Sequence, residues 1–167
     1  MANRYIPEEH LQEICGKLRG VDKIITDVLL STGFRLDDVM HLRAWELRRE
    51  VLTIRERKTG HVRSVRMPED VRESLAVHLR KRNPLRYAFP ALRSGGKAKM
   101  HRTTYWRHFM AAVAACGYDE AGYSPHSLRK VYAVRRLAES GSLSKVQADL
   151  GHTKPEVTMI YAFSDRL

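Results

Sequence analysis

The chain has 167 residues, enough for one domain with its own hydrophobic core. No apolar run approaches the roughly 18 residues that a membrane span requires, and the first residues lack a signal-peptide core, which predicts a cytoplasmic protein. Thirty Lys and Arg residues against nineteen Asp and Glu residues give a net charge of +11, and the two distant cysteines argue against a disulfide scaffold or a zinc site.

The basic residues gather in two runs. One, from Arg43 to Arg66, holds eight basic side chains against three glutamates. The other, from residue 80 to residue 107, holds nine basic side chains and no acidic one. Such clusters are typical of a surface that binds a polyanion. Nucleic acid is the favoured partner; an anionic membrane attracts similar patches, and solvated helix faces are the plainer alternative.

The apolar spacing is mostly helical. Apolar residues repeat every three or four positions from Val21 to Leu29, and Gly33 follows where a C-cap glycine belongs. Asp37 and Asp38 then stand in the first turn of a second helix, where acidic groups favour the helix dipole. Further helices are predicted over residues 71–79, 106–113, 125–139 (capped by Ser124), 143–151 (capped by Ser142) and from a capping box at Thr153 and Glu156 onward.

One segment departs from the helical pattern. The stretch VLTIRERKTGHVRSVRM, beginning at Val51, alternates in polarity, with Thr59 and Gly60 between its halves. This pattern predicts a β-hairpin with a tight turn and Lys58 at the edge of the turn. Residues 93–102 have the composition of a loop. With no internal repeat or domain boundary, the sequence predicts one α+β domain over residues 1–167, mainly α-helical, with a small antiparallel sheet.

The chemistry-bearing residues are Arg, Lys, His and Tyr in four stretches: TGFRLDD, RERKTGH, SPHSLRK and LGHTKPEVTMIYA. No phosphate-binding glycine loop, metal-binding His pair or nucleophile elbow appears in the sequence. The residues present suit chemistry on a phosphodiester without a metal. Arginines can stabilise the charge that develops on the phosphoryl oxygens, a tyrosine can attack, and Lys or His can transfer protons.

Together the four stretches resemble the catalytic domain of tyrosine recombinases, the phage integrase family. TGFRLDDVMHLR is similar to the segment of the first arginine, RERKTGHVRSVRMP to the hairpin of the lysine, HSLRK to the His-x-x-Arg box, and LGHTKPEVTMIYA to the last histidine and the nucleophile. The pieces stand in the family's order from about Leu30 to Ala162. The resemblance implies six catalytic residues: Arg35, Lys58, His126, Arg129, His152 and Tyr161.

The resemblance also has departures. Lys130 stands where a second histidine usually follows the box, a position outside the six roles. The resemblance covers a catalytic domain only, in a single-domain form without the helical DNA-clamping domain that precedes it in most members. The sequence leaves open whether this is a natural minimal enzyme or an excised domain.

Read singly, each residue also has a plainer interpretation. Arg35 could be a surface arginine at a helix start, Lys58 a solubilising hairpin charge, and His152 a favourable helix terminus. Tyr161 shares helical spacing with Val157 and Ile160, so periodicity alone would bury it.

As the resemblance implies, the reaction is DNA cleavage and rejoining through a 3′-phosphotyrosyl bond, with no cofactor and no metal. The partners it implies are double-stranded DNA with paired recombination sites and three further copies of the chain, at the nucleoid. Two alternatives remain: a type IB topoisomerase-like enzyme, and a non-catalytic DNA-binding regulator derived from a recombinase. The expected DNA contacts lie in the two basic runs: Arg55, Arg57, Arg63, Arg93, Lys97, Lys99, Arg102 and Arg107.

Overall fold

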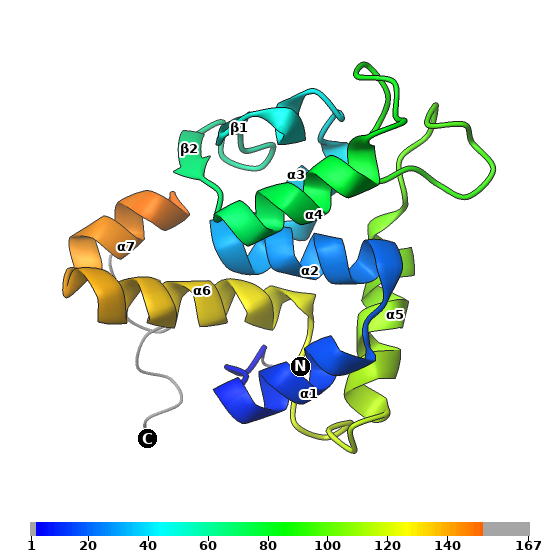
Figure 1. Ribbon diagram of the computed structural model, residues 1–167. Coiled ribbons are helices and arrows are strands. Elements are labelled where there is room, and N and C mark those ends of the chain that lie inside the picture. Colours follow the sequence, from blue (N-terminus) through cyan, green and yellow to red (C-terminus); the bar gives the residue numbers. More distant parts are fainter. Residues whose placement is uncertain (1–2, 152–167) are drawn as a thin grey trace.

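A computed structural model describes residues 3–151 of the chain. His152, Tyr161 and the helix expected after Thr153 lie outside the described residues. Within them the elements are, in chain order, α1 (Glu8–Lys17), α2 (Gly20–Thr32), α3 (Leu36–His41), the 3-10 helix η1 (Glu46–Arg48), β1 (Val51–Arg55), β2 (Val62–Arg66), α4 (Glu69–Leu79), α5 (Arg102–Ala114), α6 (Pro125–Ser140) and α7 (Leu143–Leu150) (Figure 1).

This arrangement confirms the expected fold class, a mainly helical domain with one antiparallel pair of strands. None of the described helices is both long and apolar enough to cross a membrane. The predicted helices are found with ends within a few residues of expectation, except that α5 begins four residues earlier, at Arg102. Helix α1 and η1 were not predicted from the sequence.

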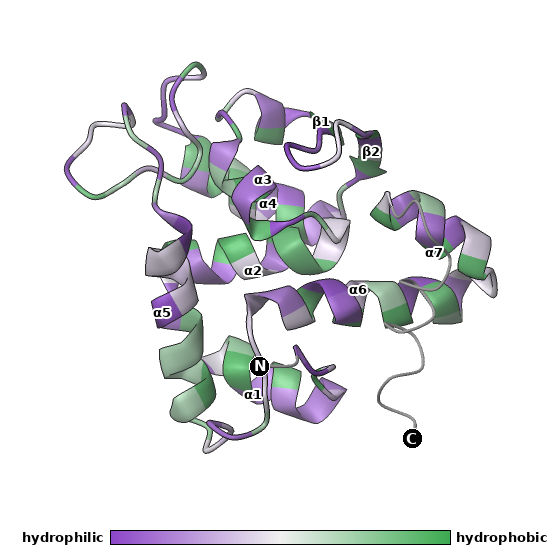
Figure 2. Ribbon diagram, turned by 180° about the vertical axis from the view of Figure 1, so that it is seen from behind, coloured by the Kyte–Doolittle hydropathy of each residue, from purple (hydrophilic) through white to green (hydrophobic). Residues whose placement is uncertain are grey.

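Helix α2 organises the interior. It packs against α6 and α4 and also contacts α3 and α5. Its apolar stripe is buried, including Ile25, Val28 and Leu29. The main hydrophobic core extends from Ile6 to Val131 and draws on most of the elements. The helices carry hydrophobic and hydrophilic residues on different faces, as expected for elements that cover a shared core (Figure 2).

Gly33 ends α2 in the left-handed conformation, at φ 61°, as its position predicted. A side chain here would also collide with α6, because a Cβ atom on Gly33 would lie 2.3 Å from Cδ1 of Tyr132. Glycine is therefore required twice, once for the backbone angle and once for the close approach. This turn directs the chain from α2 straight into Phe34 and Arg35.

The hairpin pairs β1 with β2, and the last pair in the ladder is Arg55 with Val62. Six residues, 56–61, join the strands, so the expected tight turn at Thr59-Gly60 is wrong in length. The longer loop is closed by its own hydrogen bonds: the Glu56 N–H donates to the His61 carbonyl at 2.8 Å, and the Gly60 N–H donates to the Glu56 carbonyl at 2.8 Å. Lys58 lies in this loop.

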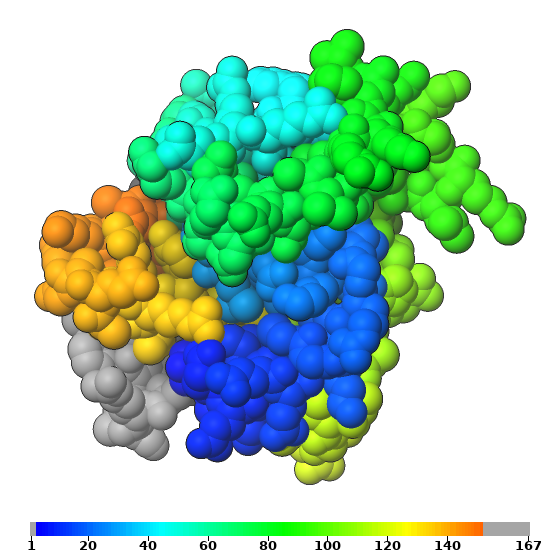
Figure 3. All heavy atoms as spheres, in the orientation of Figure 1, coloured from blue at the N-terminus to red at the C-terminus, as the bar shows by residue number. Residues whose placement is uncertain are grey.

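Two parts lie outside the main core. A smaller apolar cluster joins α6 to α7 and consists of Tyr132, Ala133, Val146 and Leu150. The segment between α4 and α5 projects from the body of the molecule (Figures 1 and 3). It is folded back on itself by backbone hydrogen bonds, such as that from the Ala91 N–H to the Ala98 carbonyl at 2.9 Å.

Candidate active site

One cleft gathers four of the six expected catalytic residues. It has a volume of about 540 Å³ and is lined by Arg35, Lys58, His126 and Arg129, among others. These residues come from three places far apart in the sequence: the turn after α2, the hairpin loop and the first turns of α6. Their convergence is a property of the fold and not of sequence proximity.

Helix α6 carries two of them because its start is firmly fixed. The Ser124 side chain accepts a hydrogen bond from the His126 N–H at 3.2 Å, and the Ser127 hydroxyl accepts one from the Ser124 N–H at 3.1 Å. This capping box, with Pro125 at the first helical position, satisfies helix-end donors that would otherwise lack partners. His126 and Arg129, three residues apart, share one face of the helix.

Arg129 is buried, with 2% of its surface exposed. Its guanidinium donates from Nη1 to the carbonyl of Gly33 and from Nη2 to the carbonyl of Leu150, each at 2.5 Å. These carbonyls stand at the C-terminal ends of α2 and α7, which carry partial negative charge. Two helix ends thus hold one cation at the base of the cleft.

Glu56 lies beside this cation and was not expected as a site residue. It directly follows β1, continues the inward alternation of Leu52 and Ile54, and is fully buried. Its carboxylate accepts hydrogen bonds from Arg35, from Arg63 at 3.3 Å and from the Thr59 hydroxyl at 2.7 Å. Arg129 Nη1 lies 3.7 Å from its Oε1.

This environment controls the ionisation of Glu56. Burial alone would raise the pKa of its carboxyl, but the hydrogen bonds from Thr59 and Arg35 and the charges of Arg35 and Arg129 outweigh burial. The pKa therefore lies below its usual value, and Glu56 is an anion at neutral pH. A charge that continues the inward alternation one step past the strand was the one sequence signal that could have pointed to it.

His126 is affected in the opposite way. Burial, followed by the charges of Arg129, Arg35, Lys130 and Lys58, lowers its pKa to about 4. The imidazole is therefore neutral at neutral pH and able to accept a proton.

Helix α3 anchors the base of the hairpin loop. Asp38 Oδ1 accepts a hydrogen bond from the Arg57 N–H at 3.0 Å, and the Asp37 carboxylate lies 3.5 Å from Arg57 Nε. Burial raises the pKa of the Asp38 carboxyl. Lys58, an exposed residue that directly follows Arg57, lines the cleft.

The expected DNA-contacting residues fall into two groups. Those at the surface include Arg57 and Arg102, which line the cleft beside the half-exposed Trp106. Arg63 is instead 4% exposed and donates to Glu56 and to the Thr32 carbonyl, so its position argues against the expected direct contact with DNA. The other expected residues with exposed or partly exposed side chains are Arg55, Arg93, Lys97, Lys99 and Arg107.

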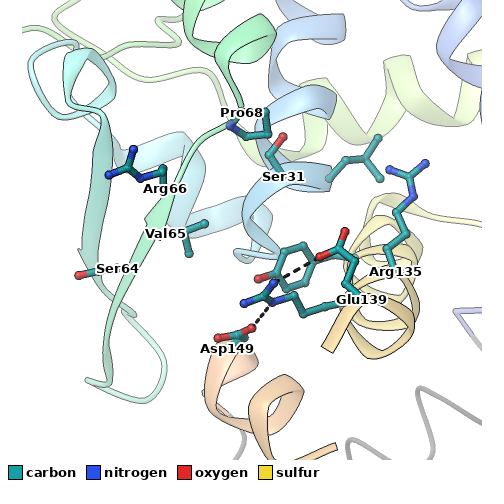
Figure 4. Close-up of a pocket in the computed structure, with 11 residues that line it drawn as sticks. Ser31, Ser64, Val65, Arg66, Pro68, Arg135, Glu139 and Asp149 are labelled. Carbon is teal, nitrogen blue, oxygen red and sulfur yellow. Dashed lines mark hydrogen bonds and ion pairs between the residues drawn. The ribbon is translucent and has the colours of Figure 1, made fainter. Parts of the chain in front are cut away.

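A second hollow, of about 470 Å³, lies between β2, α2, α6 and α7 (Figure 4). Within it, Arg136 of α6 donates to Asp149 at 2.5 Å, which ties α6 to α7, and to Glu139 of its own helix at 3.3 Å. It contains none of the expected catalytic residues. Among residues 3–151 no group of His, Cys, Asp and Glu side chains is arranged to hold a metal ion.

Comparison with known proteins gives a consistent result. Residues 4–166 match the family model described as the phage integrase family. The chain is 28% identical over 154 residues to the tyrosine recombinase XerA of Pyrococcus furiosus, covering 90% of this chain and 53% of that protein. It is 28% identical over 159 residues to the integrase of Escherichia phage P2, covering 95% of this chain and 42% of that protein.

Solved structures share the fold. A crystal structure of XerA recombinase superimposes with a TM-score of 0.78 at 23% identity, covering 95% of this chain and 58% of that chain. A lambda integrase dimer bound to a COC′ core site gives a TM-score of 0.74 at 21% identity, covering 96% of this chain and 47% of that chain. The chain thus spans about half the length of the curated relatives that it matches.

Proposed function

Because the chain belongs to the phage integrase family of tyrosine recombinases, we propose that it is a site-specific recombinase that cleaves and rejoins DNA strands. The observation that carries the proposal is the cleft in which Arg35, Lys58, His126 and Arg129 converge. A cleft rich in cations, with a neutral histidine beside them, suits the transfer of a phosphoryl group between oxygen nucleophiles.

In the proposed reaction the phenolic oxygen of Tyr161 attacks the scissile phosphorus. The bond from phosphorus to the 5′ oxygen breaks, which leaves a 3′-phosphotyrosyl bond and a free 5′ hydroxyl. His126, neutral at neutral pH, accepts the tyrosine proton, and Lys58 supplies a proton to the departing oxygen. Reversal of these steps with a new 5′ hydroxyl rejoins the strand, and ATP is not required because the covalent bond conserves the phosphodiester.

The arginines stabilise the transition state in this proposal. Arg35 and Arg129 donate to the non-bridging oxygens, on which negative charge develops, and His152 adds a further hydrogen bond. Each guanidinium offers five N–H donors, so an arginine that already bonds a protein acceptor can still donate to a phosphate. The chemistry is proposed to proceed without a metal.

The proposed partner is double-stranded DNA with paired recombination sites, bound by four copies of the chain at the nucleoid. The exposed basic residues of the hairpin and of the segment between α4 and α5 support binding along the phosphate backbone. The lambda integrase relative was solved as a dimer on its core site, which is consistent with assembly on DNA.

The test is a denaturing gel for a covalent protein–DNA adduct on nicked site DNA, in EDTA. We expect an adduct from the wild-type protein and none from Tyr161→Phe, because phenylalanine lacks the attacking oxygen. A wild-type protein that binds this DNA but forms no adduct would contradict the proposal and favour a DNA-binding regulator. Exchange between two sites identifies a recombinase, whereas supercoil relaxation without exchange identifies a topoisomerase-like enzyme.

A further inference from the structure

Both arginines assigned to the scissile phosphate meet the same carboxylate. Glu56 Oε2 accepts a hydrogen bond from Arg35 Nη1, and Glu56 Oε1 lies 3.7 Å from Arg129 Nη1. The third guanidinium, that of Arg63, donates from Nη1 to Oε1 at 3.3 Å. The Thr59 hydroxyl donates to Oε2 at 2.7 Å. One carboxylate thus stands between three cations that would otherwise repel one another.

The location of this carboxylate makes it an effective anchor. Glu56 has no exposed surface, and Arg129 and Arg63 are 2% and 4% exposed, so water screens their interactions weakly. The backbone of Glu56 is itself fixed by the closure of the hairpin loop onto His61. A rigid anion therefore defines where the guanidinium groups of Arg35 and Arg129 lie relative to each other.

The charge that remains suits a phosphodiester. Three guanidinium groups around one carboxylate leave a surplus of positive charge at the base of the cleft. A phosphate entering the cleft can share Arg35 and Arg129 with Glu56 without displacing it, because each guanidinium has further N–H groups. Preorganised donors of this kind lower the barrier because they need no rearrangement when charge develops.

We infer that Glu56 is a positioning residue, which orients Arg35 and Arg129 toward the scissile phosphate. The inference rests on the proposed function and extends it to a residue outside the six expected from the family. In this role Glu56 acts through the arginines that it contacts. Its loss therefore slows strand cleavage and leaves the affinity for DNA nearly unchanged.

The experiment measures the rate of covalent adduct formation at saturating nicked DNA, together with the DNA dissociation constant. Glu56→Gln keeps the size of the side chain, removes its charge and places an amide among the arginines. We expect the cleavage rate to fall at least about 10-fold, since removing one preorganised electrostatic contact typically costs 10²–10³-fold in rate. We expect the dissociation constant to change less than about threefold.

A second substrate separates positioning from a general structural role. A methylphosphonate at the scissile position is neutral, so its transition state carries less negative charge for Arg35 and Arg129 to stabilise. The rate deficit of Glu56→Gln should therefore shrink several-fold on this substrate. An equal deficit on both substrates, or no deficit on either, would overturn the inference.

Matched variants complete the test. Glu50→Gln makes the same substitution at the base of the same hairpin, where Glu50 pairs with Arg66 at the surface, and should cleave at the wild-type rate. If Glu56→Gln does not fold, Thr59→Val replaces it, because this exposed residue donates one of the hydrogen bonds that fix the carboxylate. Its cleavage rate should fall a few-fold on phosphate and less on methylphosphonate; an unchanged rate contradicts the inference.

The wild-type protein in the same assay separates this inference from the proposed function. If the wild-type protein forms no adduct on the phosphate substrate and none on the methylphosphonate substrate, both the proposed function and the role of Glu56 are overturned. If the wild type and Glu56→Gln form the adduct at the same rate, only the role of Glu56 is overturned.

Discussion

At the scale of single residues, the proposed site is built from side chains that also hold the fold together. Arg129 joins the ends of α2 and α7 through the carbonyls of Gly33 and Leu150. Burial and, after it, the charge of Arg129 also lower the pKa of the His126 imidazole. The arginine therefore helps to keep a proton acceptor neutral, while two backbone carbonyls and the Glu56 carboxylate hold its own guanidinium.

The lowered pKa of His126 predicts a pH-dependent stability. The unfolded chain binds a proton at this residue below about pH 6.5, whereas the folded protein binds it only below about pH 4. The unfolded state holds more protons between these values, so the free energy of unfolding should fall as the pH is lowered from 6.5 to 4. This single group contributes on the order of 3 kcal/mol across the window.

Urea denaturation at pH 7 and pH 4.5 checks this prediction. His126→Asn should lose less stability than the wild type between the two pH values, because asparagine does not titrate. Identical pH dependence in His126→Asn and the wild type would contradict the assigned shift.

At the scale of elements, the first turns of α6 position two of the expected catalytic residues, His126 and Arg129. Ser124→Ala removes the hydroxyl that caps this helix and that also donates to Asn3 Oδ1 at 2.7 Å. We expect the free energy of unfolding to fall by about 1 kcal/mol, the usual cost of losing an N-cap hydroxyl. Adduct formation should slow as well, since His126 and Arg129 follow in the first turns.

Ser142→Ala on α7 is the matched control for this cap. Its hydroxyl accepts from the Lys145 N–H at a longer distance, 3.4 Å. Chemical denaturation should therefore show a smaller loss for Ser142→Ala than for Ser124→Ala. A larger loss in the free energy of unfolding for Ser142→Ala than for Ser124→Ala would show that the capping distance does not determine these losses.

The elements also show which features a sequence can predict. The ends of α2, α6 and α7 were expected correctly because Gly33, Ser124 and Ser142 act on backbone groups within a few residues. The length of the hairpin loop was predicted wrongly, because the ladder ends at Arg55 and Val62 and Glu56 beyond it turns inward. Its arginine partners lie on other elements, and no local pattern in the strand specifies them.

At the scale of the whole molecule, the charge distribution predicts how DNA binding responds to salt. Each Lys or Arg that neutralises a phosphate releases counterions, which adds about 0.9 to the slope of log affinity against log salt concentration. Lys97 is exposed on the projecting segment between α4 and α5 (Figure 3). Lys97→Ala should therefore reduce the slope by about 0.9, as one phosphate contact requires.

Lys17→Ala provides the control for this measurement. Lys17 is exposed at the end of α1, away from the projecting segment (Figure 1), and its removal changes the net charge equally. Fluorescence anisotropy over a range of salt concentrations should give Lys17→Ala the wild-type slope. Equal reductions for both variants would mean that net charge, and not a contact at Lys97, governs binding.

The whole-molecule arrangement also explains the limits of sequence reasoning about the site. Composition and the two basic runs predicted a polyanion-binding surface, but they could not distinguish Arg63 from its exposed neighbours. Arg63 lies in β2, and its buried side chain donates a hydrogen bond to the Thr32 carbonyl of α2. The sequence of the strand alone does not identify this partner. Burial of a charge is decided by the partners that the fold brings to it.

The attachment of α7 has a consequence for dynamics. This helix rests on a small apolar cluster separate from the main core, yet its last carbonyl, that of Leu150, receives Arg129. Helices with few buried contacts open locally at a lower free energy than the whole domain unfolds. Each such opening would release one constraint on the arginine, so under the proposed function the fraction of molecules poised for strand cleavage would depend on how often α7 opens. Substitutions beneath this helix, remote from any DNA, would then tune turnover without altering affinity.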